Sequence, residues 1–364
     1  MSALILTMEN EHESTERARQ FCAEFRSPSN RQKYVFGRNV YAKSVAKFVK
    51  LSGFIDDYTS DDSFLGLPIL KTEDVHKHAL VLIASGGKPL SAKRRLDAFG
   101  LQCLDYFAFY KFSGLPLTSV VFNAGFEKEF QDNKAEYEWI YGLLHDETSC
   151  SIFRKLVSFR LKYELDLLSG FTSRESNQYF EDFLQLRPHG ETFVDVGGYN
   201  GFNSLEFIRL CPGYDAVHIF EPEPDNYQTC VRSLGPYANV HCHQMGLSNS
   251  KGVLKLAAQG SGSKISDCGS TIITVDKLDD VLPDRDAPTF IKMDIEGSEI
   301  AAIEGSSNTI KTHHPRLALC IYHNVGDFWR IPKLVLSLRD DYSIYLRHYT
   351  ESIYETVMYF IPKK

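Results

Sequence analysis

Residues 195–201 read DVGGYNG. They begin at the end of a largely apolar run, residues 192–196, and precede a segment with helical spacing, residues 203–210. This succession predicts a strand, a tight turn and a helix, and the residues that follow continue the alternation. Glycine lacks a Cβ, so the backbone can turn sharply there and approach a ligand closely. We therefore expect an α/β domain that binds a nucleotide-type ligand at the end of this strand.

The acid and the glycines of this turn discriminate between nucleotide ligands. A nicotinamide dinucleotide site needs the spacing G-x-G-x-x-G, whereas the glycines here are Gly197, Gly198 and Gly201. Asp195 would repel a pyrophosphate but could hold the ammonium of an amino-acid moiety, directly or through water. S-adenosylmethionine carries such an ammonium, so we expect these four residues to bind it.

A second acidic motif follows the next predicted strand, residues 216–220. It reads FEPEP at residues 220–224 and places Glu221 20 residues beyond Gly201. A carboxylate there can accept hydrogen bonds from two ribose hydroxyls. A dinucleotide fold uses the same spacing, and a structural turn with solvated acids is the alternative interpretation.

A third motif ends the fourth strand of the predicted sheet, residues 289–294. Residues 291–299 read IKMDIEGSE and place Asp294 at the tip of that strand, beside the crevice where open α/β sheets bind ligands. Asp294 is therefore expected to face the reaction centre. The alternative is a helix N-terminus, with Glu296 and Glu299 offsetting the dipole of the following helix.

In this order, the three motifs resemble the FkbM family of methyltransferases, whose pattern is D-V-G-A/G-x-x-G, F-E-P-x-P and K-x-D-x-E-G-x-E. The resemblance spans residues 179–360. It implies a Rossmann-like methyltransferase fold, S-adenosylmethionine as donor, and transfer to a hydroxyl of a sugar, glycan or secondary metabolite. Tyr322 departs from the pattern, because family members often have Glu before the histidine, and this leaves the role of that strand end open.

Methyl transfer to a hydroxyl requires alignment of the acceptor oxygen and a base for its proton. His323, at the predicted tip of the fifth strand, is the candidate base because imidazole titrates near neutral pH, although a lone histidine is often structural; Asp294 is its rival. A divalent metal could bind Asp294 and Glu296, but the sequence shows no complete ligand set. His241 and His243 could form a metal pair, yet histidines one strand period apart are more often surface or core residues, so we assign no metal site.

The composition limits the class of protein. With 364 residues, 43% of them hydrophobic and 24% charged, the chain is long enough for two domains of a globular protein. A net charge of -7 argues against nucleic acid as a partner. Eight cysteines are scattered singly, which predicts reduced thiols. The short apolar run at residues 3–8 is not followed by a cleavage signal, and no run approaches the ~18 residues of a membrane span. We therefore expect a cytoplasmic protein.

We expect four segments along the chain. They are an N-terminal helical segment (1–32), a small Rossmann-like domain (33–125), a helical connector (126–186) and the methyltransferase domain (187–364).

The small domain is similar to the N-terminal domain of some sugar-modifying acyltransferases. The similarity rests on residues 35–42, VFGRNVYA, with further matches at residues 53–57 and 66–69. Asn39 replaces the second glycine of the dinucleotide turn, whereas the acids at 56–57 could still meet a ribose. A nucleotide-sugar or carrier site and a scaffold or dimerisation role both remain open.

The sequence thus predicts a two-domain α/β enzyme that methylates a small-molecule or glycan acceptor and could form a homo-oligomer. Two other classes remain open. One is a non-catalytic nucleotide- or sugar-binding protein that kept the fold, and the other is an NAD-dependent oxidoreductase, for which the glycine spacing is wrong.

Overall fold

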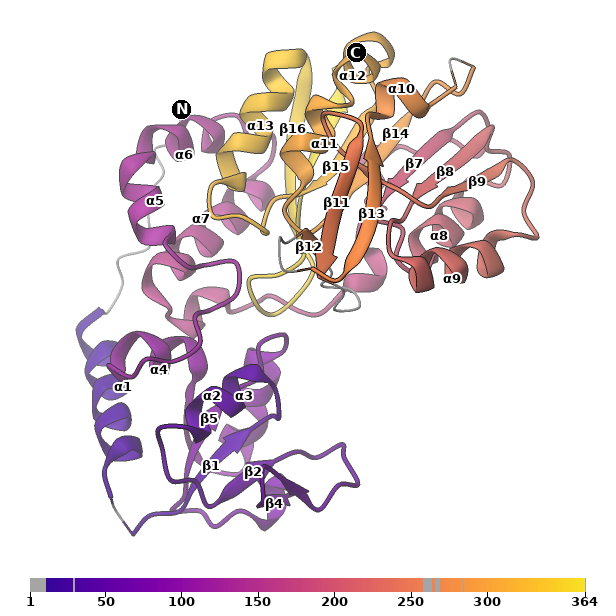
Figure 1. Cartoon of the computed structure of the whole chain (residues 1–364). Helices are drawn as coiled ribbons and strands as arrows, with labels where there is room; N and C mark the ends of the chain where they lie inside the picture. The colour runs from indigo at the N-terminus through magenta and orange to yellow at the C-terminus, as the bar shows by residue number, and fades with distance from the viewer. Residues whose placement is uncertain (1–10, 29, 258–263, 266–268, 284, 364) are drawn as a thin grey trace.

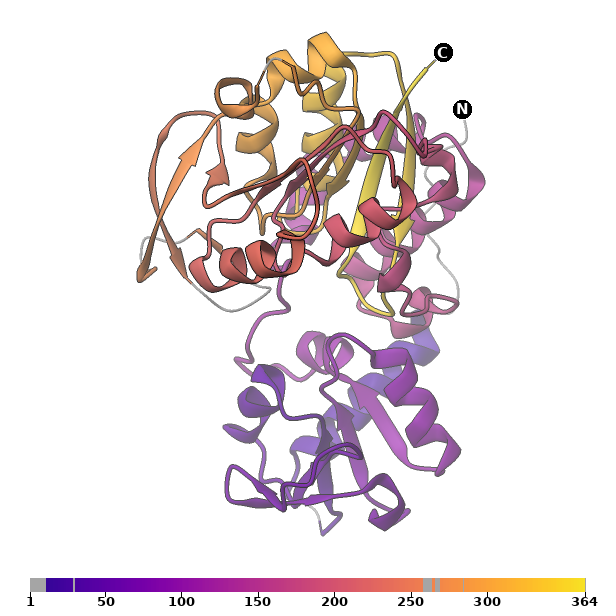
Figure 2. The same cartoon turned by 90° about the vertical axis from the view of Figure 1, so that its right-hand side faces the viewer.

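The computed structural model describes residues 11–28, 30–257, 264–265, 269–283 and 285–363. It has a smaller N-terminal lobe, drawn in indigo and purple, and a larger lobe that holds the C-terminal half of the chain (Figures 1 and 2). The Gly/Ser-rich stretch at residues 259–263, the apolar run at residues 3–8 and Cys268 lie outside the described residues.

The smaller lobe is built on a sheet in the order β3-β4-β2-β1-β5-β6, parallel except for the hairpin of β3 and β4. Side chains alternate between its two faces. Val81 and Ile83 of β5 therefore share a cluster with Leu96 of α3, whereas Leu82 shares one with Phe107 of α4. The elements are α1 (Glu11–Arg26), β1 (Lys33–Phe36), α2 (Val40–Ala46), β2 (Gly53–Ile55), β3 (Ser63–Phe64), β4 (Leu67–Leu70), β5 (Leu80–Ile83), α3 (Pro89–Ala98), β6 (Gln102–Asp105) and α4 (Tyr106–Phe112).

Helices follow where the connector was expected. They are α5 (Phe126–Asp132), α6 (Lys134–Tyr141) and α7 (Glu147–Lys162), with short 3-10 helices at Leu165–Leu168, Glu175–Asn177 and Asp182–Leu184. Asp146 caps α7 by accepting a hydrogen bond from Ser149 N at 2.8 Å, and it also pairs with Arg347 at 2.7 Å. This second contact ties the start of α7 to the sheet of the larger lobe.

The larger lobe contains a seven-stranded sheet in the order β16-β17-β15-β14-β7-β8-β9. The chain passes from β7 to β8 and β9 on one side, then returns to β14 and β15 on the other, so β7 and β14 flank the switch point. The elements are β7 (Thr192–Val196), α8 (Phe202–Leu210), β8 (Ala216–Phe220), α9 (Pro224–Leu234), β9 (Val240–His243), α10 (Leu278–Val281), β14 (Phe290–Met293), α11 (Glu299–Glu304), α12 (Ser307–His313), β15 (Arg316–Cys320), α13 (Asp327–Leu338), β16 (Tyr342–His348) and β17 (Thr356–Pro362). The predicted Rossmann-like α/β fold is confirmed.

A small separate sheet stands between β9 and β14 in the sequence. Its strands are β10 (Gly246–Leu247), β11 (Gly252–Ala257), β12 (Lys264–Ile265) and β13 (Thr271–Asp276), in the order β10-β13-β11-β12. Leu256, Ile273 and Val275 form its buried side. The sequence motifs gave no sign of this second sheet.

One hydrophobic cluster connects the two lobes. It includes Phe25 and Leu82 of the smaller lobe, Phe159 of α7, and Val194 and Phe360 of the larger sheet, all fully buried. The helices between the sheets therefore pack against both lobes. The boundaries expected at residues 126 and 187 remain a prediction.

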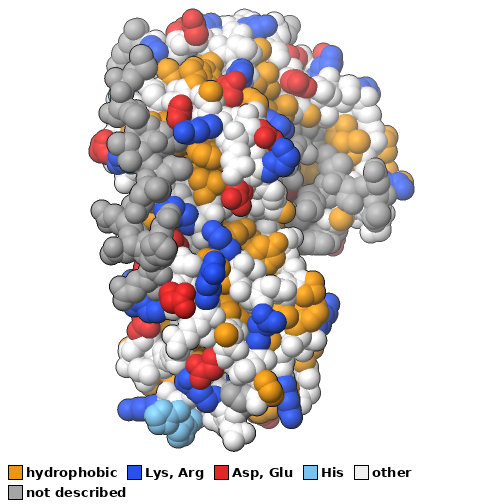
Figure 3. Space-filling model, turned by 90° about the vertical axis from the view of Figure 1, so that its left-hand side faces the viewer, with side chains coloured by type: hydrophobic (Ala, Val, Ile, Leu, Met, Phe, Trp, Pro, Cys, Tyr) orange, Lys and Arg blue, Asp and Glu red, His pale blue; other side chains and the backbone are white. Residues whose placement is uncertain are grey.

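The charge distribution on the surface and the character of the helices concern two expected absences, a nucleic-acid partner and a membrane span. Figure 3 shows one face of the molecule, where acidic and basic side chains are interspersed. Among the helices of the described ranges, none combines the length and apolar character that a membrane crossing requires.

Candidate active site

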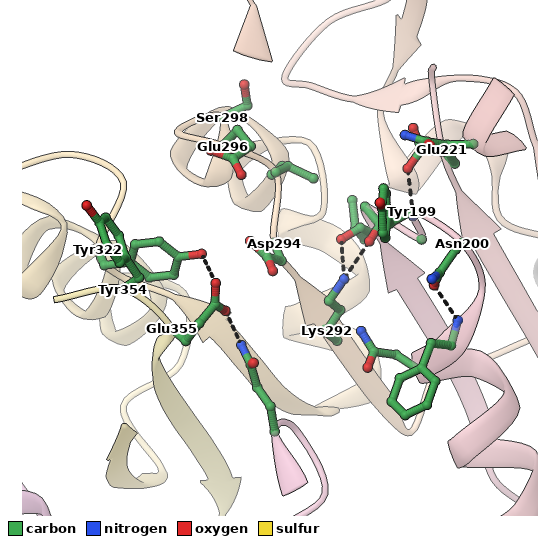
Figure 4. A pocket seen from close by; sticks show the side chains of 18 of the residues that line it. Tyr199, Asn200, Glu221, Lys292, Asp294, Glu296, Ser298, Tyr322, Tyr354 and Glu355 are labelled. Carbon is green, nitrogen blue, oxygen red and sulfur yellow. Dashed lines mark hydrogen bonds between the residues drawn. The ribbon is translucent and has the colours of Figure 1, made fainter. Parts of the chain in front are cut away.

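A cavity of about 950 Å³ opens at the carboxyl ends of β7, β8 and β14 (Figure 4). Its wall combines the glycine turn after β7, Glu221 after β8, and Asp294 with Glu296 after β14. The smaller lobe contributes as well, through Asn39, Tyr41, Gly86 and Gly87. The cavity therefore collects residues of all three sequence motifs.

The turn after β7 requires glycine for two different reasons. Gly197 has φ +82, and a Cβ there would lie 2.0 Å from Asp294 O. A Cβ at Gly198 would lie 2.2 Å from Ile219 Cγ2. Both glycines line the cavity, whereas Gly201 begins α8 at φ +81 and faces Leu234 of α9. The predicted tight turn is present, and its third glycine serves helix packing.

Asp195 is fully buried beneath this turn and is not part of the cavity wall. Its Oδ1 lies 3.0 Å from Lys292 Nζ, and its Oδ2 accepts a hydrogen bond from Ser204 Oγ at 2.8 Å. Lys292 Nζ also donates to Gly197 O at 2.6 Å. Asp195 was expected to hold an ammonium group directly or through water, and this role stays a prediction. In this structure its carboxylate is paired with the lysine that holds the glycine turn.

Lys292 keeps its charge in this buried position. Burial lowers the pKa of Lys292, but the carboxylates of Asp195 and Asp294 more than offset that effect and raise it above its usual value. A buried cation beside the turn then anchors two backbone carbonyls, since Val196 O also lies within 3.3 Å.

Glu221 lies where the second motif predicted it, at the cavity wall after β8. Its carboxylate accepts hydrogen bonds from Tyr199 N at 2.7 Å and from Glu223 N at 2.9 Å. Burial raises the pKa of Glu221. The side chain thus fixes the backbone of the glycine turn and also presents oxygen atoms to the cavity.

His323 follows β15, as predicted, but it is not one of the described residues that line the cavity. Its Nδ1 lies 2.8 Å from Glu299 Oε1, and its Nε2 lies 3.5 Å from Asp294 Oδ1 and 3.7 Å from Glu296 Oε2. Burial lowers the pKa of His323, but the three carboxylates raise it to about 10. An imidazole that is already protonated at neutral pH cannot accept a proton, so this geometry does not favour His323 as the base.

We expect the imidazole of His323 to stay protonated between pH 6 and 9. Because its folded pKa lies above the ordinary value of 6.5, its contribution to stability is fully present below pH 6.5 and is lost as the pH rises toward 10. Two-dimensional NMR of the ring nitrogens, with the signal assigned by its absence in His323→Gln, measures this directly. A titration near pH 6.5 would contradict the assigned charge.

Glu296 differs from Asp294 and Glu299, the other two acids that surround His323. It lines the cavity, and burial together with the charges of Asp294 and Glu299 raises the pKa of Glu296 to about 7. Its backbone is in the left-handed region at φ +54, followed by Gly297 at φ +103. A carboxylate held in a strained turn with a near-neutral pKa is suited to proton transfer.

Asp294 and Glu355 complete the acidic wall. Burial would raise the pKa of Asp294, but Lys292 and His323 bring it below its usual value, and Tyr179 Oη donates a hydrogen bond to it at 2.7 Å. Burial, with the charge of Asp294, raises the pKa of Glu355 to about 7. Figure 4 shows these side chains approaching the cavity from β14 and from the segment before β17.

Two residues of this wall were missed as site residues. Tyr322 Oη donates to Glu355 Oε1 at 3.0 Å, so the tyrosine that departs from the family pattern contacts a second carboxylate of the cavity. Gln178 Nε2 donates to the same carboxylate at 2.7 Å. Glu355 lies within residues 179–360, over which the resemblance extends, and the departure from the family pattern at Tyr322 was a second signal.

His241 and His243 lie on the same face of β9, as predicted, with His218 of β8 beside them. His218 Nδ1 lies 3.2 Å from His243 Nε2, and its Nε2 lies 3.1 Å from Asp286 Oδ2. Burial, with the neighbouring histidines, lowers the pKa of His218 to about 4. His243 therefore shares a hydrogen-bonded network with a buried, neutral imidazole, and His241 stacks on that imidazole.

Residues 195–351 match the family model described as the methyltransferase FkbM domain. The chain carries an FkbM methyltransferase domain. The matched range begins at Asp195 and includes the glycine turn, Glu221, Asp294 and His323. The predicted resemblance to the FkbM family is confirmed for this part of the chain.

The FkbM domain and the residues before it also have a similar solved structure. The crystal structure of methyltransferase FkbM from Methylobacillus flagellatus KT is 23% identical, with a TM-score of 0.76, and the match covers 96% of this chain and 95% of that chain. This likeness shows the fold. An rRNA methylase from Streptococcus thermophilus (15% identical, TM-score 0.35, 50% and 93% covered) and precorrin-6y C5,15-methyltransferase from Geobacter metallireducens GS-15 (12%, 0.32, 54% and 95%) are more distant. No curated protein matches the chain.

Proposed function

We propose that this FkbM domain transfers the methyl group of S-adenosylmethionine to a hydroxyl oxygen of a sugar, glycan or secondary metabolite. The observation that carries the proposal is Glu296, a carboxylate with a pKa of about 7 at the wall of a cavity that also contains the glycine turn. Such a group can take the proton that a hydroxyl loses on methylation.

The residues present fit the donor. Gly197 and Gly198 leave the backbone bare beside the cavity, and Glu221 presents carboxylate oxygens where ribose hydroxyls can donate hydrogen bonds. Leu247 and Val275 add apolar surface to the same part of the wall, as a purine base requires. The carboxylates of the cavity suit the positive charge of the donor, and Asp195 acts on this site through Lys292.

When bound, S-adenosylmethionine supplies an activated methyl group, because its sulfonium becomes a stable neutral thioether once the methyl group has been transferred. The chain then has to align the acceptor oxygen with that methyl group and exclude water. The Glu296 carboxylate, at the cavity wall, would take the proton that the acceptor hydroxyl loses on methylation. Asp294, with its lowered pKa, stays ionised and can orient the acceptor hydroxyl by accepting its hydrogen bond.

Calorimetric titration of the protein with S-adenosylhomocysteine and, separately, with NADH tests the cofactor. We expect micromolar binding of the first and none of the second. Binding of NADH alone would overturn the proposal in favour of an oxidoreductase. Silence from both would favour a non-catalytic protein.

Glu221→Ala should weaken binding of S-adenosylhomocysteine by about 100-fold or more. The change removes the carboxylate proposed to accept hydrogen bonds from two ribose hydroxyls, and two hydrogen bonds to a charged group together contribute about 3 kcal/mol. It also leaves Tyr199 N and Glu223 N, in and beside the glycine turn, without their acceptor. Calorimetry measures the loss. Glu206→Gln, on the outer face of α8 and paired with Arg209, is the matched control and should bind normally. Normal affinity of the Glu221 variant would remove this residue from the cofactor site.

A further inference from the structure

The N-terminal lobe contributes the carboxyl ends of a second parallel sheet to the cavity wall. In its sheet β1 lies between β2 and β5, so the chain leaves β1 on one side and returns on the other. Open parallel sheets bind ligands at the carboxyl ends of the strands at such a switch point. The turns that follow β1 and β5 contribute Asn39, Gly86 and Gly87 to the cavity wall.

The switch point of the methyltransferase sheet opens into the same cavity from the other lobe. Contacts close to the cavity hold the lobes together there. Tyr41 Oη lies 3.3 Å from Tyr354 Oη, and Ser91 N donates to Glu351 Oε2 at 2.7 Å. The space beside the glycine turn is thus continued by space between the lobes, where an acceptor can lie next to Glu296.

The charge of this space is one-sided. Glu175, Asp294, Glu296 and Glu355 line it, and among the described lining residues Lys292 is the single cation, already paired with a buried carboxylate. A phosphate group would meet repulsion here without a basic partner. Hydroxyl and ammonium groups would instead find carboxylate acceptors.

Aromatic side chains supply the apolar surface of the same space. The rings of Phe122, Tyr322 and Tyr354 lie together in the wall, with centroids 5.6 Å apart for the first two and 6.2 Å for Phe122 and Tyr354. Phe122 is held at φ +60, a left-handed conformation that is costly for a bulky residue. Aromatic faces next to hydrogen-bond acceptors suit the C–H faces and hydroxyls of a sugar ring.

We propose that the acceptor is a neutral or amino-bearing sugar bound between the lobes, with the turns after β1 and β5 as the far wall of its site. This inference rests on the proposed methyltransferase function. It gives the N-terminal lobe a role in acceptor binding. It also excludes phosphorylated and nucleotide-linked sugars, one of the roles that the sequence left open for this lobe.

Gly87 offers a way to test the site without disturbing the fold. A Cβ added there meets no other atom within 4 Å, and its φ is outside the left-handed region. Gly87→Phe should therefore fold and fill the far wall, and Gly87→Ala is the matched control. Binding is measured by calorimetry and saturation-transfer NMR on protein saturated with S-adenosylhomocysteine, with glucose, glucosamine, glucose 1-phosphate and UDP-glucose as probes.

We expect glucose or glucosamine to bind at least about tenfold more tightly than the two phosphorylated probes, because one like-charge contact costs more than about 1.4 kcal/mol. Gly87→Phe should weaken that binding by a similar factor, whereas Gly87→Ala should not. Tighter binding of a phosphorylated probe, absence of binding by both unphosphorylated sugars, or normal binding by Gly87→Phe would each overturn the proposal. If the unmodified protein does not bind S-adenosylhomocysteine, the proposed function itself is refuted.

Discussion

Glu296→Gln is expected to lower the turnover number by about 10²–10⁴-fold while leaving the affinity for S-adenosylhomocysteine unchanged. The amide keeps the size of the side chain but cannot accept the hydroxyl proton. In the unmodified protein the rate should rise with pH through about 7, where Glu296 loses its proton, and the variant should lack this rise. Formation of S-adenosylhomocysteine, followed across pH with a methyl-accepting sugar, measures both effects.

A matched control for this variant is Glu304→Gln. Glu304 lies at the end of α11, and its carboxylate accepts a hydrogen bond from the exposed Asn249 side chain. It should keep full turnover and the same pH profile. Should Glu296→Gln behave like this control, proton removal would fall to Asp294, Glu355 or solvent. Loss of S-adenosylhomocysteine affinity would show that Glu296 serves the cofactor rather than the proton.

Lys292→Met is expected to lower the free energy of unfolding by about 3–5 kcal/mol, because it leaves the Asp195 carboxylate buried without its cation. Both side chains are almost completely buried, with exposed fractions of 1% and 0%. The glycine turn also loses the donor to Gly197 O, so affinity for S-adenosylhomocysteine should fall as well. Urea unfolding followed by circular dichroism gives the stability, and calorimetry gives the affinity.

The double variant Asp195→Asn/Lys292→Met separates the charge from the packing. Since it removes both members of the pair, it should regain much of the stability that Lys292→Met loses. The affinity should stay low, because the turn still lacks its lysine. Equal stability of the single and double variants would mean that the buried ion pair is not what makes Lys292 important.

The strands of the larger sheet could be predicted because each is a short apolar run that ends at turn-forming or acidic residues. β7 and β8 have the bounds expected from the sequence, 192–196 and 216–220. The small sheet could not be predicted in the same way. Its strand β13 pairs with β10 on one side and β11 on the other, and such pairing depends on contacts that a local pattern does not encode.

The part of the site that could be predicted consists of residues that directly follow a strand. Glu221 and Asp294 were expected at the crevice and line the cavity. The partner of Asp195 could not be predicted, because its pairing with Lys292 follows from the register between β7 and β14. The charge of His323 was likewise invisible, since it depends on three carboxylates that the fold brings within 4 Å of one imidazole. Motif spacing locates residues along the chain, whereas protonation depends on what surrounds them in space.

The hydrophobic cluster that joins the lobes determines how the chain can be divided. Arg160 of α7 donates to Ile353 O at 3.0 Å, and Ser149 Oγ of the same helix accepts a hydrogen bond from Leu346 N at 2.8 Å. Cutting the polypeptide before residue 187 would strip this helix from β16 and leave a wide apolar surface in water. The segment that carries the chemistry is therefore shorter than the segment that folds.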